Sequence, residues 1–140
     1  MTQDTAFPLQ LQGLFFTRSI VVAMPGYDAG LPIAAPIAPA NTLDIKRAED
    51  SPLRFMVTLR STFNPESLPE HPYLIDMECM AIFSAVPEAS EEEAQRAATV
   101  TGHQVTYGAI REAVMWLTSR QPNGPFLLGI SVLTPAKASD

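Results

Sequence analysis

With 140 residues and no internal repeat, the chain is long enough for one domain with its own hydrophobic core. Its 15 acidic residues outnumber 9 lysines and arginines, which gives a net charge of -6 without a basic cluster, so no nucleic-acid-binding surface is expected. A single cysteine, and the lack of a basic leader or a long apolar run, favour a cytoplasmic protein without membrane insertion.

The first expected strand covers residues 11–24, which are rich in β-branched and aromatic residues, and Pro25 ends it. Residues 25–39 then contain four prolines, and proline is excluded from helix interiors and central strands. We expect an extended crossover that either packs on the core or forms the wall of an apolar binding groove. Its apolar side chains are Tyr27, Leu31, Ile33 and Ile37.

Two β-patterned stretches follow a short extended piece at residues 43–45. Apolar and polar residues alternate over residues 53–63, which is the period of a strand that buries one face. Residues 73–83 have one apolar face and one mixed face. Because the three prolines within residues 64–72 cannot donate ladder hydrogen bonds, we predict an antiparallel hairpin with a stiff loop.

Two helices are predicted after the hairpin. Ser90 precedes three glutamates, which suit a first helical turn, so a short helix is expected over residues 90–100, and Gly102 is expected to end it. A main helix then ends before Pro122. Its apolar stripe at i, i+3, i+4 and i+7 consists of Ile110, Ala113, Val114 and Leu117. Residues 126–133 are expected to form an extended arm or a last strand.

No catalytic or metal-binding motif stands out, so no catalytic residue, metal or cofactor is predicted. His71 and His103 lie in loop-like contexts, where a solvated histidine is the common case. Asp76 and Glu78 share a strand face about 7 Å apart, as a carboxylate pair would, but a solvated or interface face is the favoured interpretation. Cys79 has no nearby cation in the sequence and is interpreted as a packed core thiol.

The order of these segments resembles the SecB family of protein-export chaperones over about residues 12–133. The likeness is carried by FFTRSIVVAMP at residues 15–25, FMVTLRSTF at 55–63, YLIDMECMAIFSA at 73–85 and IREAVMWLTSR at 110–120. The resemblance implies an α+β fold, a four-stranded antiparallel sheet with two helices packed on one face, in a single domain over residues 1–140. It also implies assembly as a dimer of dimers.

The same resemblance implies an ATP-independent holdase that binds non-native polypeptide in an apolar groove, with a link to protein export. Apolar burial is non-directional and contributes about 25 cal/mol per Å², so such a groove accepts many sequences. The implied groove residues are Tyr27, Leu31, Ile33, Ile37 and Phe55. Residues on the strand face implicated in tetramer assembly are Ile75, Met77 and Cys79.

The chain departs from the family where the export chaperones dock the SecA motor. Ser19 and Ala23 stand where the family has acidic residues on its first strand, whereas Leu74 and Asp76 fit the companion pair on the third strand. The family's carboxy-terminal helix and acidic tail also have no counterpart before Asp140. We therefore expect a divergent relative, such as the chaperones attached to toxin and antitoxin systems or to mobile elements.

Exposed apolar residues predict a homo-oligomer. The mixed face with Leu74, Met80 and Ile82, and the apolar stretch after Gly124, exceed the apolar surface expected of a monomer. A dimer or tetramer with two-fold symmetry is expected. The alternatives to a general holdase are a dedicated adaptor for a single partner protein and, less favoured, a small-ligand carrier or enzyme.

Overall fold

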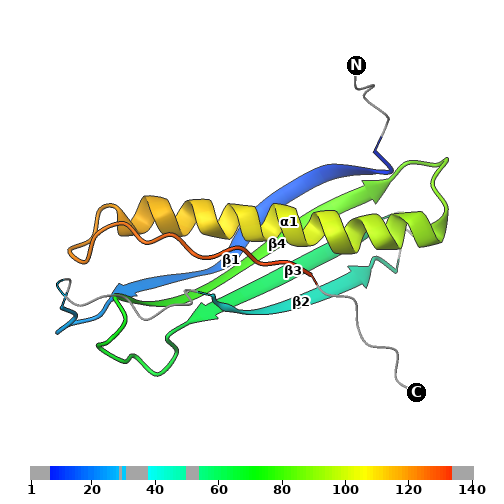
Figure 1. Cartoon of the computed structure of the whole chain (residues 1–140). Coiled ribbons are helices and arrows are strands. Elements are labelled where there is room, and N and C mark those ends of the chain that lie inside the picture. The colour runs from blue at the N-terminus through cyan, green and yellow to red at the C-terminus, as the bar shows by residue number, and fades with distance from the viewer. Residues whose placement is uncertain (1–6, 29, 31–37, 50–53, 134–140) are drawn as a thin grey trace, which may run out of the picture.

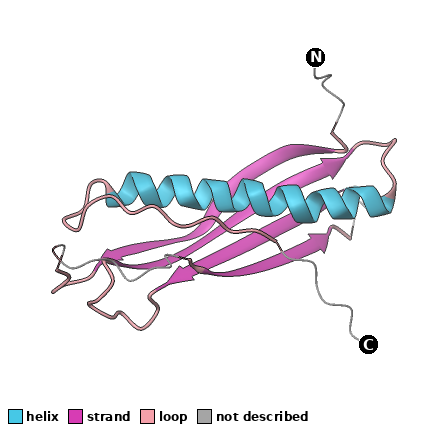
Figure 2. Ribbon diagram, viewed as in Figure 1, coloured by secondary structure: helices cyan, strands magenta, loops and turns pink. Residues whose placement is uncertain are grey.

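The structure, a computed structural model, describes residues 7–28, 30, 38–49 and 54–133. Within these residues, four strands form one antiparallel sheet in the order β1-β4-β3-β2, and one long helix crosses one face of it (Figure 1, Figure 2). The elements are β1 (Leu9–Ala23), β2 (Ala40–Arg47), β3 (Arg54–Phe63), β4 (Tyr73–Ala85) and α1 (Glu91–Thr118). The α+β class and the four-stranded antiparallel sheet are therefore confirmed.

The hairpin of β3 and β4 forms as predicted, with Phe63 opposite Ile75 beside the loop. Asn64 turns the chain with a positive φ of 55°, which asparagine tolerates well, and its Oδ1 accepts a hydrogen bond from the Leu68 N–H at 2.8 Å. β2, expected as a short extended piece, covers eight residues because all of them pair with β3. β1 pairs with β4 alone among the described strands, so its outer edge is open over 15 residues.

One continuous helix of 28 residues replaces the two predicted helices. Ser90 begins it as expected, since its Oγ accepts a hydrogen bond from the Glu93 N–H at 3.2 Å. Gly102 does not end the helix but lies buried within it, where a Cβ atom would stand 2.7 and 2.8 Å from the two γ-methyl groups of Val57. Glycine at this position permits close approach of α1 to β3. In the described part of the chain, no helix is both long and apolar enough to cross a membrane.

We expect Gly102→Ala to lower the free energy of unfolding by about 1–3 kcal/mol, because the added methyl group overpacks the contact with Val57. Gly108→Ala is the matched control on the same helix. A Cβ at Gly108 meets nothing within 4 Å, so this substitution should stabilise the protein by about 0.5–1 kcal/mol through helix propensity. Urea denaturation followed by circular dichroism measures both changes. Equal stabilisation by the two alanines would contradict the packing role of Gly102.

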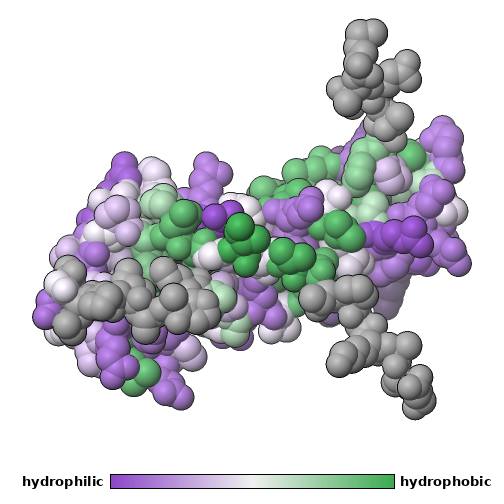
Figure 3. Space-filling model, viewed as in Figure 1, coloured by the Kyte–Doolittle hydropathy of each residue, from purple (hydrophilic) through white to green (hydrophobic). Residues whose placement is uncertain are grey.

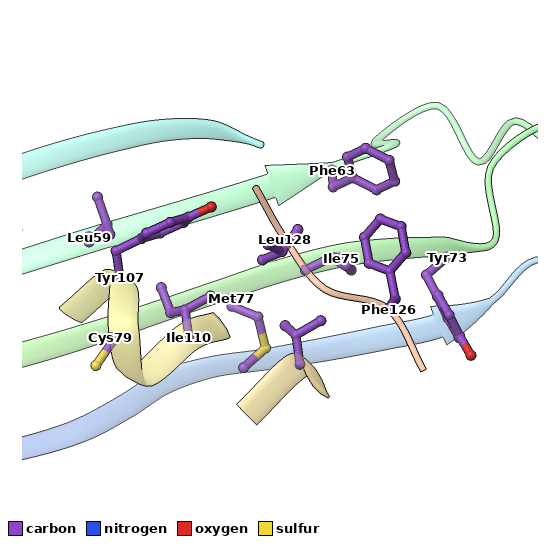
Figure 4. Packing of buried hydrophobic residues seen from close by; sticks show 11 residues of the cluster. Leu59, Phe63, Tyr73, Ile75, Met77, Cys79, Tyr107, Ile110, Phe126 and Leu128 are labelled. Atoms are coloured by element: carbon purple, nitrogen blue, oxygen red, sulfur yellow. The ribbon is translucent and has the colours of Figure 1, made fainter. Parts of the chain in front are cut away.

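The hydrophobic core lies between α1 and the sheet (Figure 4). Alternate residues of β3 and β4 point to the helix and are buried, as a period of two requires. Ile110 and Val114 of the predicted stripe are buried against them, while Ala113 and Leu117 are half-buried. The buried strand residues are Phe55, Val57, Leu59, Ser61, Phe63, Tyr73, Ile75, Met77, Cys79, Ala81, Phe83 and Ala85.

After α1 the chain turns, and residues 125–133, called the arm below, run back along the helix (Figure 1). The arm is not a strand, since no backbone-to-backbone hydrogen bond joins it to any other described segment. Phe126 and Leu128 are 3% and 0% exposed, so the arm closes the core beside α1. Of the two predicted alternatives, the extended arm is the right one.

Candidate peptide-binding surface

Four polar side chains on one flank of α1 contact the arm. Their spacing by four, four and seven residues places them on the same side of a helix with 3.6 residues per turn. They are His103, Tyr107, Arg111 and Thr118. The hydroxyl Oγ1 of Thr118 accepts a hydrogen bond from the Phe126 N–H at 2.9 Å. Arg111 Nε donates to the Leu128 carbonyl at 3.0 Å, and Tyr107 Oη donates to the Gly129 carbonyl.

His103 is buried within α1, so its predicted loop context is wrong. Its Nε2 lies 3.0 Å from Ser131 Oγ, and its ring stacks on that of Tyr107 with centroids 5.9 Å apart. Burial lowers the pKa of His103, which favours the neutral ring at neutral pH. Asn41 of β2 donates to the same Ser131 hydroxyl at 2.8 Å. The far end of the arm is thus connected to both the helix and the sheet.

This polar row was missed by the sequence analysis. The spacing of His103, Tyr107 and Arg111 by four residues was a readable signal, because it repeats along one side of a helix. A predicted helix break at Gly102 and a loop around His103 hid the repeat. The row could be recognised once α1 was seen to be continuous.

The outward side of the arm is apolar and open to solvent. Leu127, Ile130 and Val132 are 53%, 80% and 76% exposed. Hydrophobic side chains gather along the course of the arm in the space-filling view (Figure 3). Large exposed apolar side chains in a row are typical of a surface that binds another polypeptide. We call these three residues the arm band.

A second apolar surface lies where β1 extends beyond the cover of α1. By the register with β4, the side chains of Leu11, Leu14 and Phe16 share the helix-facing side of the sheet, yet all three are exposed. One pocket of about 870 Å³ lies next to this surface, lined by Phe7 and Pro8 just before β1, by the loop before α1 and by the first half of α1 around Val100. Another of about 510 Å³ lies between Phe16 and Trp116. We call this surface, together with the open edge of the strand, the β1 edge.

The opposite face of the sheet carries a network of charged and polar side chains. Asp76 accepts hydrogen bonds from Arg60 Nη2 at 2.8 Å and Arg60 Nε at 2.9 Å, and one from Arg18 Nη1 at 3.2 Å. Its neighbour Glu78 accepts one from the Thr17 hydroxyl at 2.6 Å. The hydrogen bonds from Arg60 lower the pKa of Asp76. The two carboxylates therefore hold strands together, which agrees with the favoured interpretation over an acid and base pair.

The lowered pKa of Asp76 predicts a pH-dependent contribution to stability. The pKa of Asp76 is lower in the folded than in the unfolded chain. The ion pairs therefore stabilise the fold fully at pH values above the unfolded-state pKa of about 3.9. This stabilisation is lost as the pH falls through the folded-state value. We expect Asp76→Asn to lower the free energy of unfolding at pH 7 and to differ less from wild type near pH 3, measured by urea denaturation. A difference that is independent of pH would contradict this role.

The predicted motor-docking residues Leu74 and Asp76 both lie on this charged face. Ser19 and Ala23, placed beside them by the sequence comparison, lie on the helix-facing side, opposite buried residues of β4. The first-strand neighbour of Asp76 is Ile20. Among Ser19, Ala23, Leu74 and Asp76, only Asp76 is acidic, and its carboxylate is paired with Arg60 and Arg18.

The predicted groove residues are only partly described. Tyr27 is half-buried just after β1, and Leu31, Ile33 and Ile37 lie outside the described residues. Phe55 points to the helix side of β3 and is buried beneath the first half of α1. Its ring is therefore part of the core and offers no surface to a bound polypeptide.

The predicted subunit interface needs a similar correction. Ile75, Met77 and Cys79 belong to the core cluster between β4 and α1 (Figure 4). Because α1 covers that face of β4, these side chains leave no surface for a second subunit. The face of β4 that no described helix covers is the mixed one, where Leu74, Met80 and Ile82 are half-buried, not exposed as expected.

The described residues contain no group of three or more histidine, cysteine or acidic side chains that could hold a metal ion. Burial raises the pKa of Cys79 to about 11, so the thiol stays protonated at neutral pH, in agreement with a packed core thiol. His71 contacts the Phe63 ring edge-on, with ring centroids 5.2 Å apart, whereas His103 contacts the arm.

Comparison with known proteins gives a structural match without a sequence match. No family model matches the chain, and no curated protein matches it. A SecB-like chaperone from Mycobacterium tuberculosis, solved in complex with a ChAD peptide from an antitoxin, is 20% identical, with a TM-score of 0.60 over 89% of this chain and 88% of the other. A protein of unknown function from Streptococcus agalactiae is 11% identical, with a TM-score of 0.57 over 90% of this chain and 100% of the other. The chain thus has the fold of a SecB-like chaperone, which confirms at the level of the fold the resemblance found in the sequence.

Proposed function

We propose that the protein is an ATP-independent, SecB-like holdase that binds non-native polypeptide in extended form. The observation that carries the proposal is the arm band. Its residues Leu127, Ile130 and Val132 are exposed, although the same arm is fixed to the core by buried residues. The fold supports it, because the Mycobacterium tuberculosis chaperone of the same fold was solved with a bound peptide. The crossover residues predicted to line a groove remain part of this proposal.

Apolar side chains in a row suit this function physically. Full burial of one large aliphatic side chain contributes about 1.5–3 kcal/mol, whatever residue the client supplies opposite it. An extended client that covers two or three positions of the arm band would gain about 3–9 kcal/mol from burial, from which the entropic cost of association is subtracted. Such binding has low sequence specificity, as a holdase requires.

An aggregation assay tests the proposal. An unfolded client diluted from denaturant should stay in solution at a stoichiometric ratio of the protein without ATP, as measured by light scattering. The variant with Ile130→Asp and Val132→Asp should lose this effect, because the carboxylates keep the arm band hydrated. Val22→Asp, which places the same charge at an exposed apolar position on the charged face of the sheet, is the control and should remain active. Full activity of the double variant would count against the arm band.

A dedicated adaptor for one partner protein is the second candidate. It is favoured by the peptide in the Mycobacterium tuberculosis structure, which comes from an antitoxin. Affinity purification of the tagged chain separates the two candidates. One dominant partner at stoichiometric yield would support the adaptor, whereas many partners in small amounts would support the holdase. The cytoplasm remains the expected location for either.

We also propose that the protein assembles as a homo-oligomer through the β1 edge. Strand β1 has an unpaired outer edge of 15 residues within the described sheet, and such an edge is a template for pairing with another strand. Leu11, Leu14 and Phe16 add exposed apolar area beside it. A two-fold axis at this edge would pair two copies of β1 and extend the sheet across the dimer. A dimer of dimers would need a second contact elsewhere.

A further inference from the structure

The arm is held as an extended peptide ligand is held. The backbone groups of three of its residues are met by side chains of α1, not by a neighbouring strand. Just before the arm, Tyr73 Oη donates to the Gly124 carbonyl at 2.5 Å. Hydrogen bonds from side chains to backbone groups do not depend on the sequence of the segment that they hold. The same contacts are therefore open to another extended segment.

Contacts that depend on the sequence of the arm are made by the hydroxyl of Ser131, near His103 and Asn41, and by two buried apolar side chains. Phe126 and Leu128, two residues apart in an extended segment, point into the core, whereas Leu127 between them points outward. The Phe126 ring packs against Phe63 and Tyr73, with ring centroids 5.1 and 5.9 Å apart (Figure 4). An occupant of this groove needs two large apolar side chains at positions i and i+2, and tolerates any residue between them.

We propose that the groove filled by the arm, between α1 and the sheet, is itself a peptide-binding site and that the arm is its built-in competitor. This inference rests on the proposed holdase function, in which a client first binds the arm band, and it names the class of client that then displaces the arm, an extended segment with large apolar residues at i and i+2. Such a segment takes the places of Phe126 and Leu128 while the arm leaves. The core stays covered, because the client supplies the side chains that the arm withdraws.

Competition by the arm would set a threshold for binding. A tethered segment acts at an effective concentration in the millimolar range, so a client must bind the groove well enough to displace it. Folded proteins keep their apolar i and i+2 residues buried and would be excluded. Non-native chains expose many such pairs and would be accepted.

A cross-link that locks the arm tests the inference. Asn41→Cys and Ser131→Cys place two thiols at side chains that are in contact, since Asn41 Nδ2 and Ser131 Oγ are 2.8 Å apart. A short bifunctional thiol reagent then joins the arm to β2, and Cys79 is buried away from it. The probe is a fluorescent synthetic copy of residues 125–133, and its binding to the full-length chain is followed by fluorescence anisotropy.

The double variant without the cross-link should bind the probe at least as tightly as the wild type, because its arm has lost the hydrogen bonds of Ser131, and the cross-linked form should bind the probe at least tenfold more weakly than the same variant before cross-linking. A probe that carries Leu128→Asp should bind the wild type at least tenfold more weakly, and an unfolded client should displace the intact probe. Equal affinities of the locked and unlocked forms would overturn the inference, as would lack of probe binding by the wild type. Neither of these results decides whether the protein is a holdase, because the aggregation assay tests that separately. Failure of this inference can therefore be distinguished from failure of the proposed function.

Discussion

Phe126→Ala should lower the free energy of unfolding by about 3–5 kcal/mol, the largest loss we expect from a single substitution in the arm. The side chain is 3% exposed and packs against two aromatic rings, those of Phe63 and Tyr73. Its removal leaves a cavity that these rings cannot fill without moving. Urea denaturation followed by tryptophan fluorescence measures the change through Trp116, the one tryptophan of the chain.

Leu127→Ala is the matched control, because it removes a similar apolar side chain from the next position of the arm. Leu127 is 53% exposed, and substitutions at such sites usually change stability by less than about 0.5 kcal/mol. A large loss at both positions would mean that the outward side of the arm is also packed. No loss at Phe126 would mean that the arm is released from the core in solution.

Phe16→Asp should convert the homo-oligomer to monomers. The residue lies on the β1 edge and is 40% exposed, and a carboxylate there would have to lose its hydration when a second copy of β1 packs against it. A desolvation cost of about 3 kcal/mol weakens association by about 100-fold. Size-exclusion chromatography with light scattering measures the mass of the particle. The unfolding transition should stay close to that of the wild type.

Leu68→Asp is the control for this charge, because Leu68 has a similar exposure of 39% but lies in the loop between β3 and β4. It should leave the mass unchanged. If both variants remain oligomeric, the subunit contact lies away from the β1 edge. If wild type is itself a monomer, the proposed assembly is wrong, although binding of clients along the arm would not depend on it.

Strand positions were predictable because the alternation of apolar and polar residues is a local property of the chain. In β3 and β4 every second residue is buried, so the period of two appears directly in the sequence. The loop between them was predictable as well, because its prolines cannot join a ladder. The length of β2 was underestimated, since its residues owe their strand conformation to pairing with β3 rather than to a strong pattern of their own.

The helix was predicted less well for the opposite reason. Glycine lowers helix propensity, so a local interpretation of Gly102 predicts a break. In the folded chain, the contact with Val57 requires the absence of a side chain there, and packing compensates for the lower propensity. Tertiary contacts across about 45 residues of sequence therefore decide the continuity of α1, and local sequence does not contain them.

The candidate site shows the same division. The apolar and extended character of residues 126–133 could be derived from the sequence alone, but the choice between an arm and a last strand could not. That Phe126 and Leu128 turn inward, while Ile130 and Val132 turn outward, depends on the side chains of α1 that bind the arm. The burial of Phe55 and Cys79 beneath α1 was also decided by tertiary structure, because the apolar faces of β3 and β4 could have packed against either a helix or a second subunit.

Sequence by itself thus determined the antiparallel hairpin, the apolar face of each strand and the resemblance to SecB-like chaperones. Tertiary structure decided which face α1 covers, which apolar residues remain exposed and that Asp76 is paired with two arginines. The physical reason is that the period of apolar residues in the sequence indicates which side chains of a strand or helix are buried. The period does not indicate which segment covers these side chains, because that segment is distant in sequence and is positioned only when the whole chain packs.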